Sequence, residues 1–118
     1  MRCVGPTFAG EELQALKADL EFDPALDELA TVLALIGSPT RLRICDLLDR
    51  TEQMCVCDLA EVLGLSVSAV SQNLAKLRAH RIVKYRREAQ TLYYRLADHP
   101  QTPAILTLLA AARSEAGE

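Results

Sequence analysis

Apolar residues recur at helical spacing along most of this chain, and they alternate with polar residues in only one region. Recurrence at i, i+3, i+4 and i+7 is typical of an amphipathic helix, whereas strict alternation is typical of a half-buried strand. Alternation occurs in residues 82–86 and 92–96, which read as the two strands of a hairpin. Helical spacing predicts helices over residues 11–20, 25–36, 39–50, 58–63, 67–79 and 103–115. The pattern therefore predicts a mainly α protein with a small β-hairpin.

Residues 58–80 read as a helix-turn-helix, around which the other elements are arranged. Gly64 follows the apolar residues of the first helix, where a residue in the left-handed conformation commonly ends a helix. Ser66 is the expected N-cap of the second helix. That helix carries three apolar residues on one stripe, namely Val70, Leu74 and Leu77. Its opposite side is polar, so we expect one buried and one exposed face.

The polar side of residues 67–79 suits a helix that lies in the major groove of DNA. Serine, glutamine and asparagine hydrogen-bond to base edges there, while lysine and arginine hold phosphates. The expected DNA-binding residues of this segment are Ser66, Ser68, Ser71, Gln72, Asn73, Lys76 and Arg78. An ordinary amphipathic helical hairpin would also expose a polar face, so that alternative stays open at this point.

The hairpin over residues 82–96 follows the helix-turn-helix directly, and this order of elements is that of a winged helix. Its tip is expected to reach a neighbouring groove or the DNA backbone. Arg86 and Arg87 are the wing residues expected near phosphates. A solvated hairpin, or a winged-helix module that binds another protein, is the alternative.

Charge is distributed unevenly along the chain, although the formal net charge is only −3. Residues 11–28 hold seven acids and one base. Residues 76–95 hold one acid, Glu88, and seven bases, which are Lys76, Arg78, Arg81, Lys84, Arg86, Arg87 and Arg95. Positive potential beside a helix-turn-helix favours binding to nucleic acid despite the acidic total.

Length and composition limit the class of protein. We expect residues 1–118 to form a single domain with one modest core. No apolar run reaches the length of about 18 residues that a membrane span needs, and the N-terminus lacks the apolar segment of a signal peptide. We therefore expect a cytoplasmic protein without a membrane partner. No glycine-rich phosphate loop, carboxylate pair or histidine with a nucleophile is visible, so neither enzyme activity nor a small organic substrate is expected.

Both ends of the chain carry more apolar surface than a small DNA-binding core requires. Residues 1–9 show no periodicity and read as a flexible arm. Residues 10–37 and 103–115 are expected to form dimerisation helices, because such apolar terminal helices need a partner across a two-fold axis. We therefore expect a homodimer.

Cys55 and Cys57 stand at the start of the helix-turn-helix, within the segment MCVCDLA. Two thiolates at a helix start, where the backbone is not yet helical, can share a soft ion such as Cd(II), Pb(II), Zn(II) or As(III). Such a pair leaves the coordination of the ion incomplete, and Cys3 is the expected third donor. A pair of structural thiols is the alternative. Cys45, by contrast, falls within an apolar helical stripe and reads as a small core residue.

The segments SPTRLRICDLLDR and CVCDLAEVLGLSVSAVSQNLAKLR, followed by a basic hairpin, resemble the ArsR/SmtB family of metal-responsive winged-helix repressors. The resemblance covers about residues 29–96, and its most specific part is the CVCDL motif. It implies a homodimer that binds operator DNA when metal-free and releases it when a toxic ion binds. It also implies a CadC-like or ArsR-like site at the motif.

The family's metal positions are only partly present. The third thiolate of the arsenic sensors falls on Ala60, and a second arm cysteine of the cadmium and lead sensors falls on Thr7. Asp98 and His99 partly echo the start of the zinc sensors' second site, whose later ligands have no counterpart here. We expect that second site to be absent and His99 to be a turn residue.

These residues predict a metal(loid)-sensing transcriptional repressor that binds double-stranded operator DNA when metal-free. The expected metal ligands are Cys3, Cys55 and Cys57. Cd(II) or Pb(II) is favoured as the inducing ion, with As(III) and Zn(II) as alternatives. A repressor that senses oxidation of the same thiols is the competing hypothesis.

Overall fold

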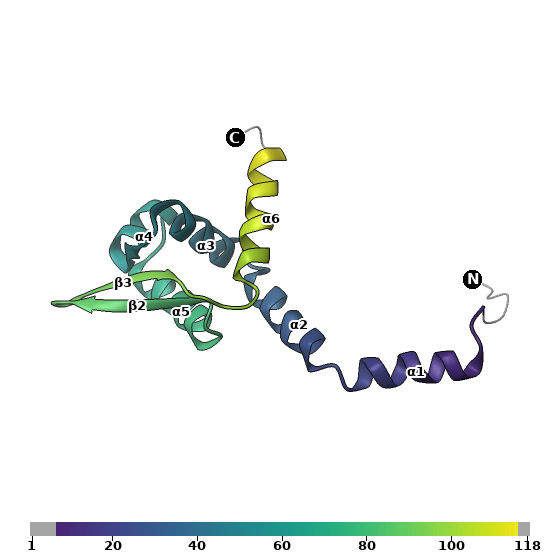
Figure 1. Cartoon of the computed structure of the whole chain (residues 1–118). Coiled ribbons are helices and arrows are strands. Elements are labelled where there is room, and N and C mark those ends of the chain that lie inside the picture. Colours follow the sequence, from purple (N-terminus) through teal and green to yellow (C-terminus); the bar gives the residue numbers. More distant parts are fainter. Residues whose placement is uncertain (1–6, 116–118) are drawn as a thin grey trace. The chain divides into compact units, whose positions relative to one another are not determined.

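The computed structural model describes residues 7–115 and confirms a mainly α chain with a small antiparallel sheet (Figure 1). The chain divides into two compact units, one ending at Ala30 and the other beginning at Thr31. The elements are α1 (Gly10–Glu21), α2 (Pro24–Ile36), α3 (Pro39–Thr51), β1 (Met54–Cys55), α4 (Val56–Leu63), α5 (Val67–Ala79), β2 (Val83–Glu88), β3 (Thr91–Leu96) and α6 (Thr102–Glu115). The expectation of a single domain over residues 1–118 stays a prediction.

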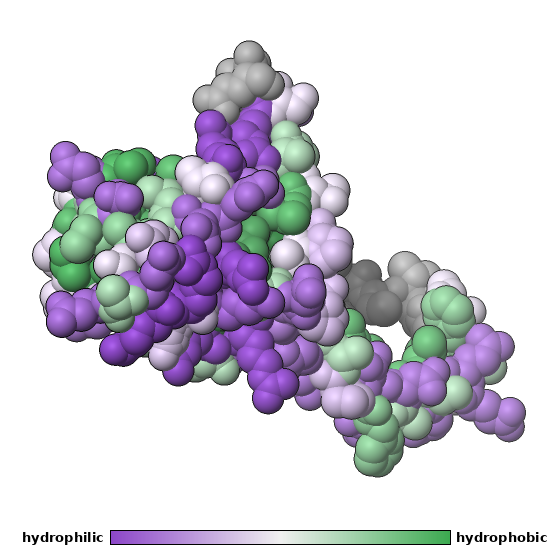
Figure 2. All heavy atoms as spheres, turned by 60° about the vertical axis from the view of Figure 1, so that its left-hand side comes forward, coloured by the Kyte–Doolittle hydropathy of each residue, from purple (hydrophilic) through white to green (hydrophobic). Residues whose placement is uncertain are grey.

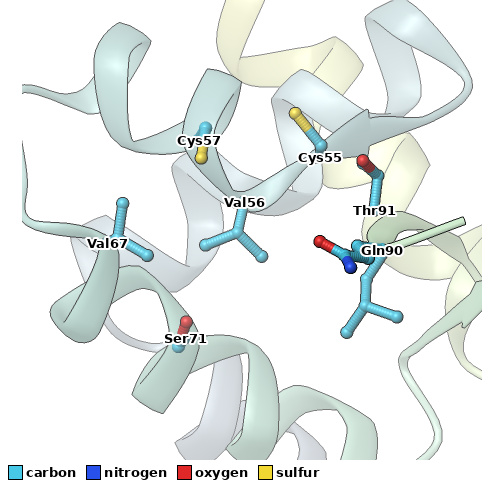
Figure 3. Close-up of a pocket in the computed structure, with 8 residues that line it drawn as sticks. Cys55, Val56, Cys57, Val67, Ser71, Gln90 and Thr91 are labelled. Atoms are coloured by element: carbon cyan, nitrogen blue, oxygen red, sulfur yellow. The ribbon is translucent and has the colours of Figure 1, made fainter. Parts of the chain in front are cut away.

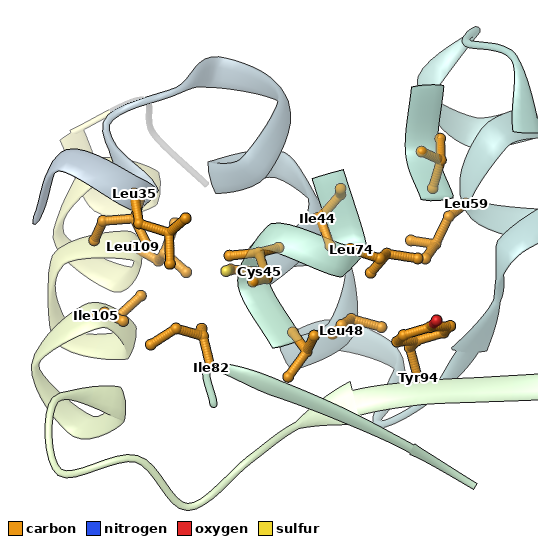
Figure 4. Close-up of a cluster of buried hydrophobic side chains, with 14 of the residues drawn as sticks. Leu35, Ile44, Cys45, Leu48, Leu59, Leu74, Ile82, Tyr94, Ile105 and Leu109 are labelled. Atoms are coloured by element: carbon orange, nitrogen blue, oxygen red, sulfur yellow. The ribbon is translucent and has the colours of Figure 1, made fainter. Parts of the chain in front are cut away.

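The core of the second unit is aliphatic and draws on nearly every element (Figure 4). The stripe predicted for α5 is buried in full, because its three apolar residues share one helical face. α3 and α4 contribute side chains of the same kind from their own inner faces. The largest fully buried side chains are Ile44, Leu48, Leu59, Leu74, Leu77 and Ile82. This packing holds the helix-turn-helix in a fixed relation to α3 and to the sheet.

The ends of the helix-turn-helix follow the local signals of the sequence. Gly64 adopts the left-handed conformation (φ 66°) at the end of α4, and the Ser66 hydroxyl accepts a hydrogen bond from the Ala69 amide at 3.0 Å at the start of α5. Both ends were predicted correctly. α4 begins at Val56, two residues earlier than the predicted start at Asp58.

The sheet has three strands in the order β1-β3-β2, so the prediction of a hairpin alone was incomplete. The hairpin strands β2 and β3 are longer than predicted, and the tight turn between them places Ala89 in the left-handed region (φ 55°). The additional strand β1 pairs antiparallel with β3, Met54 opposite Tyr94 and Cys55 opposite Tyr93. Cys55, one of the predicted metal ligands, is therefore part of the same sheet as the wing.

The terminal helices α1 and α6 differ in how they are packed. No residue of α1 is buried, and its leucines at positions 13, 16 and 20 are 42%, 51% and 65% exposed. α6 packs on α3 through Ile105 and Leu109, and Arg113 adds ion pairs to Asp46 and Asp49 of α3 at 2.6 and 3.2 Å. Within residues 7–115, no helix combines the length and the hydropathy needed to cross a bilayer.

Candidate functional site

The outward face of α5 is the first part of the candidate site. Ser68, Ser71, Gln72 and Lys76 are all exposed, in agreement with the expected polar side of this helix. Ser66 is exposed as well, but its hydroxyl already caps the helix. Figure 2 brings the wing end of the molecule forward, and hydrophilic residues cover much of that view. The exposed α5 side chains provide hydroxyl, amide and ammonium groups of the kinds that contact bases and phosphates.

Asn73 is arranged differently from these neighbours. Its side chain is half-buried, and its Oδ1 accepts a hydrogen bond from Nη1 of Arg41 at 3.2 Å. Its Nδ2 donates to the carbonyl oxygen of Ala69 at 2.9 Å. Both ends of the amide are thus engaged within the protein, which differs from its expected role as a base-reading group.

Arg86 and Arg78 are both held against tyrosine rings. The Arg86 guanidinium lies 4.7 Å from the centre of the Tyr93 ring, and that of Arg78 lies 4.5 Å from the centre of the Tyr85 ring. Such stacking orients a cation that would otherwise sample many rotamers. Both arginines were expected near phosphates from the sequence, whereas the tyrosines that support them were not predicted. Alternating aromatic residues next to basic ones in the wing are the signal that was available.

Arg86 also connects the wing to the segment that precedes the cysteines. Its Nη1 pairs with Glu88 at 2.7 Å, and its Nε donates to Oε1 of Gln53 at 3.3 Å. Gln53 comes directly before β1. Arg86 is consequently linked to the same short segment that carries Cys55. Arg86 and Arg87 are both exposed on the wing.

Cys55 and Cys57 flank the entrance to α4. Cys55 is extended (φ −82°, ψ 164°) and precedes the first helical residue, while Cys57 is exposed in the first turn. The prediction that the backbone is not yet helical at the first of the two cysteines is therefore confirmed. Because Cys55 is not helical, helical spacing alone does not set the directions of the two side chains.

A pocket joins the two cysteines to α5 and to the wing (Figure 3). Both cysteines line it, together with Val67 and Ser71 from α5. The hairpin contributes the remaining wall through Gln90, Thr91 and Leu92. A group bound at the cysteines would thus lie beside residues expected to face DNA, a juxtaposition that the sequence alone did not indicate.

The described residues contain no cluster of three or more Cys, His, Asp or Glu side chains placed to hold a metal ion. Two cysteines line the pocket, and thiolate sulfur is the kind of donor that a thiophilic ion prefers. The predicted third donor, Cys3, lies outside the described residues.

Cys45 and His99, which were not expected to bind a metal, are held within the folded chain. Cys45 is completely buried, and burial raises the pKa of its thiol to about 11, as expected of a core residue. His99 is buried in the turn before α6, where its Nδ1 accepts a hydrogen bond from the Gln101 amide at 3.0 Å. This arrangement agrees with the prediction that His99 is a turn residue. It also occupies one of the two ring nitrogens through which a histidine can bind a metal.

Comparison with known proteins agrees with this architecture. Residues 38–85 match the family model described as bacterial regulatory protein, arsR family. The chain is 37% identical over 97 residues to a transcriptional repressor SmtB homolog of Synechocystis sp., covering 82% of this chain and 73% of that protein. It is 32% identical over 88 residues to a cadmium resistance transcriptional regulatory protein CadC homolog of Staphylococcus aureus, covering 75% and 72%.

Among solved structures, NolR from Sinorhizobium fredii is 33% identical and superposes with a TM-score of 0.66, over 92% of this chain and 96% of that one. The matched family model spans α3, the helix-turn-helix and the start of the wing. From the order of elements, the exposed face of α5 and these similarities together, the chain belongs to the ArsR/SmtB family of winged-helix transcriptional regulators.

Proposed function

We propose that this chain is a dimeric, metal(loid)-responsive repressor that binds operator DNA when metal-free and dissociates when a thiophilic ion binds. Cd(II) and Pb(II) are the favoured inducers, with As(III) close behind and Zn(II) as a further alternative. The name of the CadC homolog, a cadmium resistance regulator, supports an ion of this class. The observation that carries the proposal is the pocket shared by Cys55, Cys57, α5 and the wing.

The ligands of the proposed site are Cys55 and Cys57, completed by Cys3 from the same chain or from a partner copy. Sulfur is a soft donor, so this set favours thiophilic ions over Mg²⁺ or Ca²⁺. Two sulfurs from the described residues require at least one further donor, which is why the variant Cys3→Ser is part of the test. An ion bound there would draw the three cysteines together and displace their thiol protons.

The hydrogen bonds around β1 support a route from the cysteines to the wing. Cys55 lies opposite Tyr93 in the sheet, and the ring of Tyr93 lies beneath the Arg86 guanidinium. Gln53, two residues before Cys55, accepts a hydrogen bond from Arg86. A shift of this segment would therefore change the position of an arginine proposed to contact phosphate. Such coupling typically alters affinity about 5- to 150-fold.

The proposed DNA contacts divide into two groups. Ser68, Ser71 and Gln72 face outward on α5 and are assigned to base edges, with Ser66 at the start of the helix near the backbone. Phosphate contacts are assigned to the cations beside them, which are Lys76, Arg78, Arg86 and Arg87. Because these residues are basic, operator affinity should fall steeply with salt.

Dimerisation is proposed from the exposed apolar side chains of the terminal helices. Leu16 in α1 is 51% exposed and Leu108 in α6 is 58% exposed, and each would be covered in a homodimer. Two reading helices related by a two-fold axis would meet successive major grooves, about 34–36 Å apart. A palindromic operator is the expected partner.

The experiment is fluorescence anisotropy on reduced protein bound to a labelled duplex that the wild-type protein has selected from a random library. Cd(II), Pb(II), As(III) and Zn(II) are titrated in parallel into the wild type, Cys55→Ser, Cys57→Ser and Cys3→Ser. We expect at least one ion to release the wild type and to leave Cys55→Ser bound. Cys45→Ala is the matched control, since that thiol is buried away from the pocket.

The same titration separates the redox hypothesis. Operator binding that ignores every ion, but is lost on mild oxidation and regained with reductant, would replace the ion with an oxidant as the signal. Salt-independent binding, or no DNA selected at all, would contradict the repressor itself.

A further inference from the structure

One arginine in α3 joins the end of α2 to α5, the proposed reading helix. The Nε of Arg41 donates a hydrogen bond to the carbonyl oxygen of Leu35 in the last turn of α2. Its Nη1 donates to Oδ1 of Asn73 in α5 at 3.2 Å. Arg41 is partly buried, and so are both of these hydrogen bonds. Three helices thus meet at a single side chain.

The chemistry of the arginine side chain suits this position. The last turn of α2 contains no basic residue, so its free carbonyls at the negative end of the helix dipole lack a cation of their own. Arg41 supplies that cation from α3. A planar guanidinium holds two acceptors in a fixed geometry, which the point charge of lysine does not. The side chain therefore fixes a distance between α2 and α5 as well as neutralising a helix end.

On the side of α5, Asn73 completes the connection. It follows the exposed Gln72 and precedes the buried Leu74, so it lies at the border between the outward face and the core. Its Nδ2 donates a hydrogen bond to the Ala69 carbonyl at 2.9 Å, while its Oδ1 accepts one from Nη1 of Arg41. To read a base through two hydrogen bonds, an asparagine needs both its amide oxygen and its amide nitrogen free to face outward. In Asn73 both atoms are hydrogen-bonded within the protein.

We propose that Arg41 and Asn73 are positioning residues that set the orientation of the reading helix, and that Asn73 does not read a base. Sequence selectivity then rests on the outward side chains Ser68, Ser71 and Gln72. The inference rests on operator binding by the chain and is independent of the ion response. Its failure is therefore distinguishable from failure of the proposed sensor.

The test is a double-mutant cycle in operator affinity with Arg41→Ala, Asn73→Ala and the double variant. The probe is the duplex selected by the wild type, together with a set of duplexes that each change one base pair. Each single variant should bind the selected duplex about tenfold more weakly, as expected for loss of a charge-assisted hydrogen bond. The double variant should be no weaker than the worse single variant, because both substitutions break one connection.

If Asn73 contacted a base, its substitution would change the preference for that base, so base preferences are measured next. With Asn73→Ala, affinities for the single-base-pair variants should fall by a common factor, so the preferred base at every position stays the same. In the wild type, the side-chain amide resonance of Asn73 should keep its chemical shift when DNA is added. Selective loss of preference at one base pair, or a large shift of that resonance, would overturn the proposal.

Two further variants separate positioning from a simple charge contact. Arg41→Lys keeps the positive charge but loses the planar group that donates to two acceptors. It should bind the operator as weakly as Arg41→Ala, and the dependence of its affinity on salt should match that of the wild type. Arg41 would instead be assigned to a phosphate if Arg41→Lys restored operator affinity. The same would follow if the effects of Arg41→Ala and Asn73→Ala added and Arg41→Ala reduced the salt dependence of log affinity by about one. Arg43→Ala, an exposed position on the same helix, is the matched control and should change affinity less than twofold.

Affinities are compared at a temperature where circular dichroism shows that all variants are folded. If Arg41→Ala unfolds, Arg41→Lys together with Asn73→Ala carries the test.

Discussion

Cys45 and Cys57 stand only twelve residues apart, but they lie in opposite environments. Cys45 is on the inner face of α3, wholly buried among aliphatic side chains (Figure 4). Cys57 is exposed in the first turn of α4 and borders the pocket that reaches α5 and the wing (Figure 3). The residue type is identical, so the difference is made by helix phase and by what each helix packs against. A thiol becomes available for chemistry only where the fold leaves it at a surface.

The largest expected difference between the two cysteines is their rate of alkylation. Cys57 reacts from the folded state, whereas Cys45 reacts only after an opening that exposes the core. Such an opening costs about 5 kcal/mol or more, so Cys45 should be labelled at least about a thousandfold more slowly. Iodoacetamide pulses followed by trypsin separate the sites, because Cys45 falls in the peptide ICDLLDR, whereas Cys55 and Cys57 fall together in the peptide from Thr51 to Lys76.

Labelling in denaturant is the control, and there the two peptides should react at similar rates. Comparable rates in the folded protein would contradict the buried position of Cys45. If the thiols near the pocket are the ion ligands, a bound ion should protect the longer peptide and leave ICDLLDR unaffected.

Serine substitution gives the next largest difference, measured as the free energy of unfolding in urea. Cys45→Ser places a hydroxyl in an apolar core and should destabilise the chain by about 1–3 kcal/mol. Cys57→Ser changes an exposed atom and should stay within about 0.5 kcal/mol of the wild type. Equal losses at the two positions would mean that Cys57 is packed in the assembled protein, for example against a second copy of the chain.

The elements that the sequence predicted are those whose signals are local. Gly64 and Ser66 determine the ends of two helices through their own conformation and hydrogen bonding. The buried stripe of α5 needed only the spacing of its apolar residues. The core position of Cys45 followed from the same periodicity within α3.

What the sequence did not predict depends on partners far along the chain. The strand β1 has only two residues, too few to show alternation, and it exists because β3 pairs with it from positions 93 and 94. Asn73 looked like another polar residue of the outward face, since its partner Arg41 lies 32 residues earlier. The pocket likewise needs the turn of the wing to return Gln90 and Thr91 to the cysteines. Each feature is a long-range contact that periodicity does not encode.

The smallest expected difference is a pH dependence that belongs to Cys45. Burial raises the pKa of its thiol from 9.0 to about 11, because the charged thiolate is poorly solvated in the core. The unfolded chain deprotonates first as pH rises, so the native state then holds more protons and the free energy of unfolding falls. This contribution to stability is complete below the pKa of the unfolded chain and is lost progressively as the pH approaches the folded value.

Cys45→Ala removes both the sulfur's packing and this titration. At about pH 7 the wild type should be more stable than the variant by about 1 kcal/mol, the cost of deleting one buried group of this size. By about pH 10 the wild type should have lost about 1 kcal/mol that the variant does not lose, so the two unfolding free energies should converge. Urea denaturation of both proteins at a series of pH values measures the gap, and comparing them cancels the tyrosines and lysines that titrate in each. A gap that stays constant across this range would show that Cys45 does not resist ionisation, and the contrast with Cys57 would then rest on accessibility alone.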